Sequence, residues 1–156
     1  MSGDGLFSAL SALVDEGAGL LVGTSDAERV PRATRGWGVR CDEAGTVRVV
    51  VSADDPLVVA NLTGSIAVTG AEIRTLSSAQ LKGRVVDVVE PDPIDREVAD
   101  RQTTSFFDAV VATDGDELEM LRRLVPTRML TVLIDVTDGF DQTPGPSAGA
   151  VLEDVR

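Results

Sequence analysis

Short apolar segments at close spacing dominate this chain and restrict what it can fold into. Five of them fall within the first 90 residues, each is as long as a single strand, and residues typical of turns separate them. A sixth follows a long polar stretch. The expected strands cover residues 18–25, 30–40, 46–52, 65–70, 79–90 and 129–140. Short strands with tight turns favour an antiparallel sheet closed into a barrel over a doubly wound parallel sheet.

Helical patterns lie around these strands. Apolar residues at helical spacing predict a helix over residues 5–15. An Asp-Pro pair at 55–56 and another at 92–93 predict two further helix starts, because Asp caps a helix well and Pro fits its first position. The helix after residue 93 is expected to be long, with a break near residues 103–104. We therefore expect a mainly β fold that carries helices.

Length and composition predict the domain organisation. The chain has 156 residues, of which 43% are hydrophobic, enough for one core. We expect a single domain over residues 1–142 and a C-terminal tail over residues 143–156. No apolar run approaches the roughly 20 residues of a membrane span, and no signal-peptide pattern is visible. We therefore expect a cytoplasmic protein without a membrane partner.

Charge and reactive residues exclude several classes of function. The formal net charge of −12 argues against nucleic-acid binding, because phosphate contacts need a positive surface. The chain has no histidine and one cysteine, Cys41, which excludes an internal disulfide, a serine-histidine triad and the usual zinc or haem sites. We predict no metal site. Acid–base chemistry then depends on carboxylates, on Lys82 or on a bound cofactor.

Positive charge gathers in one part of this acidic chain. Residues 1–28 hold five acids and no base, whereas residues 29–48 hold five arginines against Asp42 and Glu43. A local basic patch would attract a small anionic ligand. The alternative is that these arginines are solvated strand ends, since arginine is common on surfaces.

Lys82 is the only lysine of the chain and falls within an expected strand. Side chains alternate along a strand, so Gln80, Lys82 and Arg84 are expected on one face, opposite an apolar face. This row is either the wet side of a half-buried strand or the wall of a ligand groove. Gly83, between them, predicts a bulge or a close approach of backbone or ligand.

The order of these segments resembles the pyridoxamine 5′-phosphate oxidase-like family of FMN-binding split barrels. The similarity covers residues 18–90, and "QLKGRVVDV" is its most telling stretch. The resemblance implies a six-stranded antiparallel Greek-key split barrel and a homodimer that holds FMN in a groove shared by two subunits. It implies an oxidoreductase that acts on a small substrate. Some relatives of this fold use a deazaflavin instead.

The resemblance also implies the residues that would hold the flavin. The second expected strand would face the flavin or its phosphate, the third would end at the phosphate pocket, and the fifth would border the dimer groove. On this basis the cofactor-binding residues are Arg32, Arg35, Trp37, Ser52, Gln80 and Lys82. Arginine and lysine form the charge-assisted bonds that a phosphate requires.

One turn departs from the family pattern. Flavin-binding members commonly carry a Ser or Thr followed by an Arg-Lys pair after the third strand, and this chain has Asp54 and Asp55 there. Two carboxylates at close range repel a phosphate dianion. Either Arg32, Arg35 or Arg74 compensates, or the protein binds no FMN.

Two hypotheses of function therefore stay open. The first is a flavin-dependent oxidoreductase, in which the isoalloxazine ring carries the redox chemistry. The second is a cofactor-free dimeric split barrel that binds a ligand or regulates a partner and has lost the grip on FMN phosphate.

Overall fold

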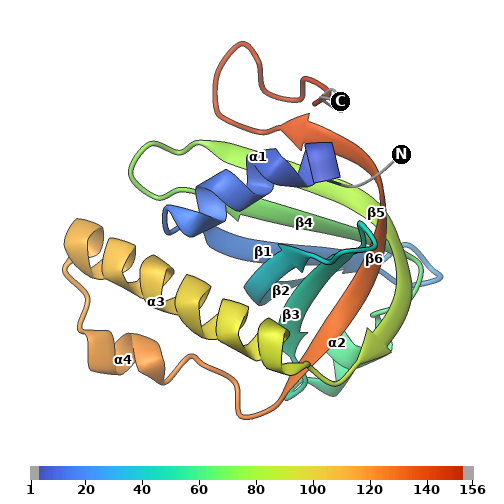
Figure 1. Ribbon diagram of the computed structural model, residues 1–156, viewed down its shortest axis with the longest axis horizontal. Coiled ribbons are helices and arrows are strands. Elements are labelled where there is room, and N and C mark those ends of the chain that lie inside the picture. Colours follow the sequence, from blue (N-terminus) through green and yellow to red (C-terminus); the bar gives the residue numbers. More distant parts are fainter. Residues whose placement is uncertain (1–3, 153–156) are drawn as a thin grey trace.

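Six strands form one closed antiparallel barrel in the computed structural model, which describes residues 4–152 (Figure 1). Around the barrel they follow the order β1-β2-β3-β6-β5-β4. Their bounds are β1 Gly19–Ser25, β2 Pro31–Cys41, β3 Val47–Ser52, β4 Ser65–Ala71, β5 Ser78–Val89 and β6 Met129–Asp141. The predicted mainly β fold and the antiparallel barrel are confirmed.

The position of β6 explains how the barrel closes. Strands β1, β2 and β3 form a meander, and β4 pairs with both β1 and β5. The last strand then enters between β3 and β5 and pairs with both. Two segments far apart in the chain are thereby joined, and no edge strand is left open.

The barrel core comes from strands with alternating burial. Apolar side chains such as Val22, Val49 and Leu81 point inward and are at most 2% exposed. Helix α1, Asp4–Asp15, adds Leu10 to this core. At Gly70 an added Cβ would lie 2.6 Å from Leu10 Cδ1, so glycine lets the helix pack closely on β4.

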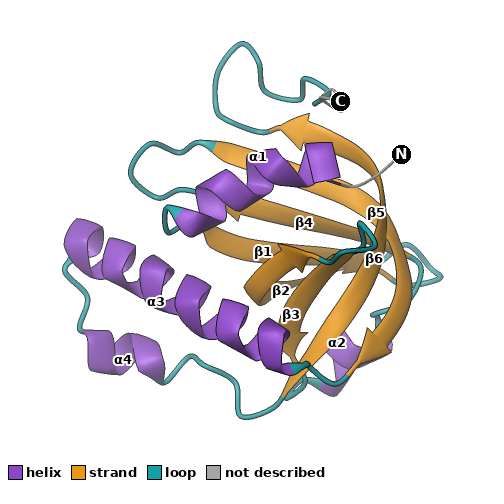
Figure 2. Ribbon diagram, viewed as in Figure 1, coloured by secondary structure: helices purple, strands orange, loops and turns teal. Residues whose placement is uncertain are grey.

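Helix α3, Pro93–Asp114, covers the outside of β2 and β3 (Figure 2). It begins with a capping box between Asp92 and Asp95. The predicted break near residues 103–104 is wrong, because the helix is continuous. The hydroxyls there are satisfied without a break: Thr103 donates to the Trp37 carbonyl at 3.1 Å and Thr104 to the Asp100 carbonyl at 2.9 Å.

A bulge in β2 makes room for a second core between the barrel and α3. The pairing with β3 shifts between Gly36 and Gly38, so that Trp37 turns outward onto Phe107 of α3. At Gly38 an added Cβ would meet the Ala99 Cα at 2.7 Å, so the helix backbone lies directly on the strand. The bulge therefore decides which β2 side chains lie beside α3.

Two short helices complete the fold. Helix α2, Pro56–Ala60, starts at Asp55, whose side chain accepts from the Leu57 N–H as predicted. Helix α4, Leu118–Arg122, precedes the loop into β6. None of the described helices combines the length and the apolar character needed to cross a membrane. In the predicted tail, Leu152 donates to Gly139 at 2.8 Å, and residues 153–156 lie outside the described residues.

Candidate functional site

Arg35 is held between two aromatic rings where β2 meets α3. Its guanidinium carbon lies 4.2 Å from the centroid of the Phe106 ring and 5.6 Å from that of Trp37. Trp37 faces this way because of the β2 bulge, and Phe106 comes from the middle of α3. Cation–π contacts of this kind orient the guanidinium group without using its N–H donors.

Among residues 4–152 the Arg35 guanidinium has no carboxylate partner, and its donors make no hydrogen bond. Its side chain is half-buried, and this burial lowers the pKa of Arg35. A desolvated cation with free donors is costly unless an anion or an acceptor completes it. The geometry therefore marks Arg35 as a position where a ligand acceptor could bind.

A hollow of about 440 Å³ opens beside this arginine, and we call it the Arg35 pocket. Its volume lies within the range of roughly 300–1,000 Å³ that is usual for small-molecule sites. Its walls come from the middle of β2, from the end of β3 and from the loop between α4 and β6. The lining residues are Thr34, Arg35, Trp37, Ser52, Asp54 and residues 123–127.

Apolar side chains form part of the rim of this pocket. Leu124 is 55% exposed and Val125 is 36% exposed, although both belong to a loop that packs beside Trp37 in the pocket wall. Exposed apolar groups next to a recessed cation suit a ligand with a flat apolar body and a polar edge.

Asp54 also lines the Arg35 pocket. One carboxylate oxygen accepts from the Thr127 N–H at 2.8 Å, and the other accepts from the Thr127 hydroxyl at 2.9 Å and the Arg128 N–H at 3.0 Å. The bond from the Thr127 backbone is the main cause that lowers the pKa of Asp54. Asp54 is therefore a fixed negative charge in this pocket.

A second hollow, of about 390 Å³, lies on the outer face of the barrel around Lys82, and we call it the Lys82 groove. Residues of β1 and β4 line it, together with Lys82, Gly83 and Arg84 of β5. The Lys82 Nζ lies 4.9 Å from the centroid of the Phe140 ring. Both cations of this groove are exposed.

The arrangement of six strands around one barrel matches solved structures. HupZ of Group A Streptococcus aligns over 91% of this chain and 98% of its own, with 14% identity and a TM-score of 0.55. A candidate pyridoxamine 5′-phosphate oxidase from Lactobacillus delbrueckii aligns over 84% of this chain and 89% of its own, with 12% identity and a TM-score of 0.50. This chain has the FMN-binding split-barrel fold.

Other comparisons add little to this split-barrel assignment. No family model matches the sequence, and no curated protein does so. An F420 reductase aligns over 83% of this chain at 16% identity with a TM-score of 0.46, too low to support an argument. At these identities the likeness establishes the fold alone.

Within this split barrel the six predicted cofactor residues fall into separate places. Arg35, Trp37 and Ser52 lie together in the Arg35 pocket, whereas Lys82 lies in the Lys82 groove. Neither lining includes Gln80, which donates to the Thr69 hydroxyl at 2.9 Å, or Arg32, which is exposed near the start of β2.

The two hollows nevertheless share the outer face of the split barrel. Arg35 pairs with Leu21, Leu21 with Thr69, and Thr69 with Gln80, so these residues form one row across β2, β1, β4 and β5. Three strand spacings of about 4.8 Å separate its ends by roughly 14 Å. Lys82 is two positions beyond Gln80, too far to meet Arg35 inside one chain.

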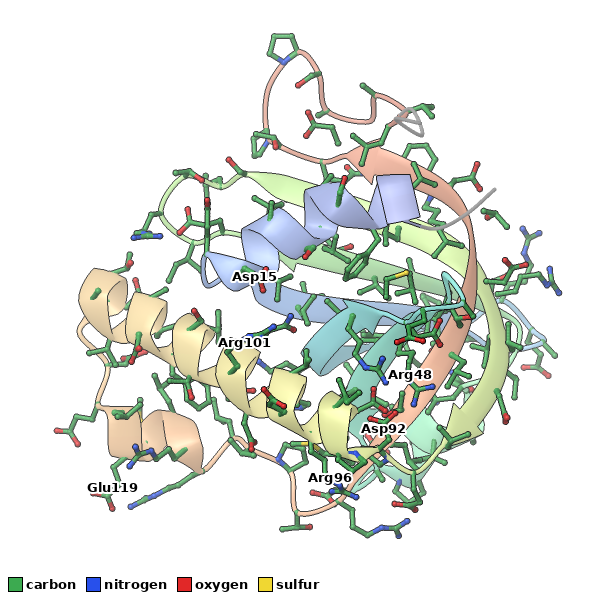
Figure 3. The ribbon with its side chains drawn as sticks, viewed as in Figure 1. Asp15, Arg48, Asp92, Arg96, Arg101 and Glu119 are labelled. Carbon is green, nitrogen blue, oxygen red and sulfur yellow. The ribbon has the colours of Figure 1, made fainter. Side chains whose placement is uncertain are left out.

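Two of the five arginines of the predicted basic patch are neutralised within the fold, while Arg29 and Arg32 are exposed. Arg40 and Arg48 both bind Asp92 and Asp95 at the start of α3, with their shortest bonds at 2.7 and 2.6 Å. Figure 3 shows Arg48 and Asp92 of this cluster. Their side chains are only 16% and 12% exposed. The alternative of solvated strand ends is therefore wrong for both arginines, and neither is free to bind a ligand.

Arg74 is also occupied. Its Nε donates to Glu72 at 2.7 Å, and Glu72 is 2% exposed. This bond from Arg74 is the main cause that lowers the pKa of Glu72 to about 2. Of the three arginines considered as compensation for the acidic turn, Arg35 alone lies in the pocket without an ion-pair partner among the described residues.

Phe106 and Thr127 are site residues that the sequence did not reveal. Neither residue belongs to a sequence motif. Both belong to the segment inserted between β5 and β6: Phe106 stacks on the Arg35 guanidinium, and Thr127 lines the pocket. The side chains of β5 in the Lys82 groove, by contrast, alternate as predicted, with Lys82 and Arg84 outward and Leu81 inward.

Proposed function

We propose that this protein binds a flavin-type cofactor in the Arg35 pocket and acts as an oxidoreductase on a small substrate. The observation that carries the proposal is the guanidinium of Arg35, half-buried between Trp37 and Phe106 and without an acceptor in the described chain. The split-barrel fold supports it, since the Lactobacillus neighbour is a candidate pyridoxamine 5′-phosphate oxidase.

The ring of a flavin suits the chemistry of this pocket. A tricyclic ring offers a flat apolar body for the rim at Leu124 and Val125, and carbonyl oxygens that accept from the Arg35 donors. A bound flavin would supply the electron or hydride transfer. The chain would then bind the ring, orient its polar edge and place a positive charge beside it.

The phosphate of FMN fits this pocket poorly. The turn after β3 presents Asp54 to the pocket, while Ser52 accepts the Asp54 N–H at 3.1 Å and Asp55 caps α2. No arginine or lysine replaces the pair expected at this turn. FMN, a deazaflavin and other flavins therefore differ in which ligand group would lie next to Asp54.

A second copy of the chain is part of the proposal. The outer face beside Arg35 exposes Leu21 by 56%, among the small residues Gly23, Ala33 and Ala67 of neighbouring strands. A flat face with a projecting apolar side chain is suited to burial against an equivalent face. Packing of two copies would bring Lys82 of one toward the Arg35 pocket of the other, which a single chain cannot do.

Flavin binding is tested with the purified protein. We expect a flavin absorption spectrum, or uptake of added flavin with quenched flavin fluorescence. Arg35→Gln should weaken this binding at least tenfold, because it removes the unpaired cation. Arg101→Gln is the control, since Arg101 is 62% exposed and contacts only Asp15 at 3.9 Å. Equal binding by Arg35→Gln and the unchanged protein would contradict the proposed site.

The dimer is tested by its mass in solution. Leu21→Arg should convert a dimer into a monomer, because a charge at this position must be desolvated on assembly. Val86→Arg is the matched control, since Val86 is 63% exposed and lies six positions beyond Gln80 on β5. A dimer that survives Leu21→Arg, or a monomeric parent protein, would contradict the proposed interface.

One observation favours the cofactor-free alternative. Asp54 already binds the backbone donors of Thr127 and Arg128, as an anionic ligand otherwise would. A protein that is purified without colour and takes up no flavin would be a binding or regulatory module. Its ligand would still meet the free donors of Arg35.

A further inference from the structure

The Arg35 pocket contains an anion of its own. Asp54 accepts three hydrogen bonds from Thr127 and Arg128 at 2.8–3.0 Å, and these bonds hold its carboxylate where the loop enters β6. Two of the donors are backbone N–H groups, the donors that commonly bind phosphate oxygens in proteins. An incoming phosphate would therefore find these donors occupied and a negative charge in their place.

The charged side chains that line the pocket are Arg35, Arg123 and Asp54. Arg123 lies 3.6 Å from Glu119 and is 77% exposed, so water screens its charge. Asp54 is held by three hydrogen bonds, so the part of a ligand next to it meets a fixed negative charge, of which the charge of Arg128 offsets a small part. A neutral group is accommodated there, whereas a phosphate dianion is repelled at close range.

We propose that the pocket selects flavin-type ligands that carry no phosphate next to Asp54 and that it discriminates against FMN. This inference rests on the proposed function, because it concerns which flavin the same pocket accepts. The Arg35 donors bind the carbonyl edge of the ring, and the wall at Asp54 accepts an uncharged hydroxylated side chain. Riboflavin has these properties, and the phosphate of FMN does not.

The test compares riboflavin with FMN on the full-length protein. Each is titrated at low salt, and binding is followed by the quenching of flavin fluorescence. We expect riboflavin to bind at least as tightly as FMN. Asp54→Asn should then improve FMN binding relative to riboflavin at least fivefold, since it removes the repelling charge.

Asp55→Asn is the matched control. It makes the same change of charge one position away, in a residue outside the lining of the Arg35 pocket, and asparagine keeps the N-cap of α2. We expect it to change the ratio of the two affinities less than twofold.

A second measurement needs no variant and guards against a misfolded Asp54→Asn. Salt screens exposed charges, so raising the ionic strength should improve FMN binding relative to riboflavin in the unchanged protein. Tighter binding of FMN than of riboflavin by tenfold at low salt would overturn the inference and leave the proposed function intact. Binding of neither ligand would overturn the proposed function and the inference with it.

Discussion

Replacing Asp95 with asparagine should destabilise the fold more than any other charge removal on α3. The Asp95 carboxylate is 1% exposed and accepts from Arg48 at 2.6 and 3.0 Å, from Arg40 at 2.7 Å and from the Thr131 hydroxyl at 3.0 Å. Removing one partner of a buried ion pair costs about 3–5 kcal/mol. Asp92, which is 41% exposed, would remain as the only carboxylate for two guanidinium groups.

The loss is measured by unfolding in urea at pH 7. Trp37 is the single tryptophan and is 5% exposed, so its fluorescence reports the loss of the core between β2 and α3. In a chain of this size each kcal/mol lowers Tm by about 2–4 °C, which predicts a decrease of roughly 6–20 °C. Asp108→Asn, at an exposed position of the same helix, should change the unfolding free energy by no more than about 0.5 kcal/mol.

If Asp95→Asn lowers the unfolding free energy by less than about 1 kcal/mol, the reasoning is refuted, because a loss that small is typical of an exposed salt bridge. It would mean that Arg40 and Arg48 reach water or Asp92 at little cost once Asp95 is neutral. The cluster would then be a surface feature, despite the 12% exposure of the Arg48 side chain.

Two further predictions concern the barrel and its acids. Gly83→Ala should lower the unfolding free energy by about 1–3 kcal/mol in urea, because the new Cβ would collide with the Asp135 carbonyl. Gly23→Ala is the control, since a Cβ added there has no atom within 4 Å, and it should be neutral or slightly stabilising. Burial alone would raise the pKa of Asp95, but hydrogen bonds from Arg48 and Arg40 outweigh it and hold this pKa well below its ordinary range. The pKa of Glu72 is also lowered, to about 2. Since both pKa values are lower in the folded state, their stabilisation is complete above about pH 5 and declines as the pH falls from there toward 2. Unfolding free energies at pH 7, 4 and 3 should follow this decline, and Asp95→Asn should flatten it; a stability that rises on acidification would contradict these assignments.

Local patterns predicted most of the secondary structure. Asp55 and Asp92 cap their helices as expected, because N-capping depends on residues within one turn. The alternation along β5 also holds, and the bulge beside Gly83 matches the prediction for a glycine inside a strand. The break near Thr103 was wrong because threonine hydroxyls found carbonyl partners that only the packed helix supplies.

The site was less predictable because its parts meet only after the barrel closes. Arg48 and Asp95 are 47 residues apart in the chain, and Arg35 and Phe106 lie on a strand and on a helix inserted after the fifth strand. No short-range pattern tells which arginines of the second and third strands will find a carboxylate. The sequence therefore revealed a basic segment, and the fold decides which members of it are neutralised.

The arginines of the barrel differ in whether they have a carboxylate partner. Arg40, Arg48 and Arg74 each bind a carboxylate whose side chain is at most 2% exposed, so their charges are used within the fold. Arg35 is half-buried too, yet it stacks on Phe106 and has no carboxylate within the described part of the chain. A fold that pairs its two more deeply buried arginines, Arg40 and Arg48, would gain stability by pairing or replacing this one. The proposed flavin would complete it, and Asp54, which lines the same pocket, would limit how much negative charge such a ligand can bring.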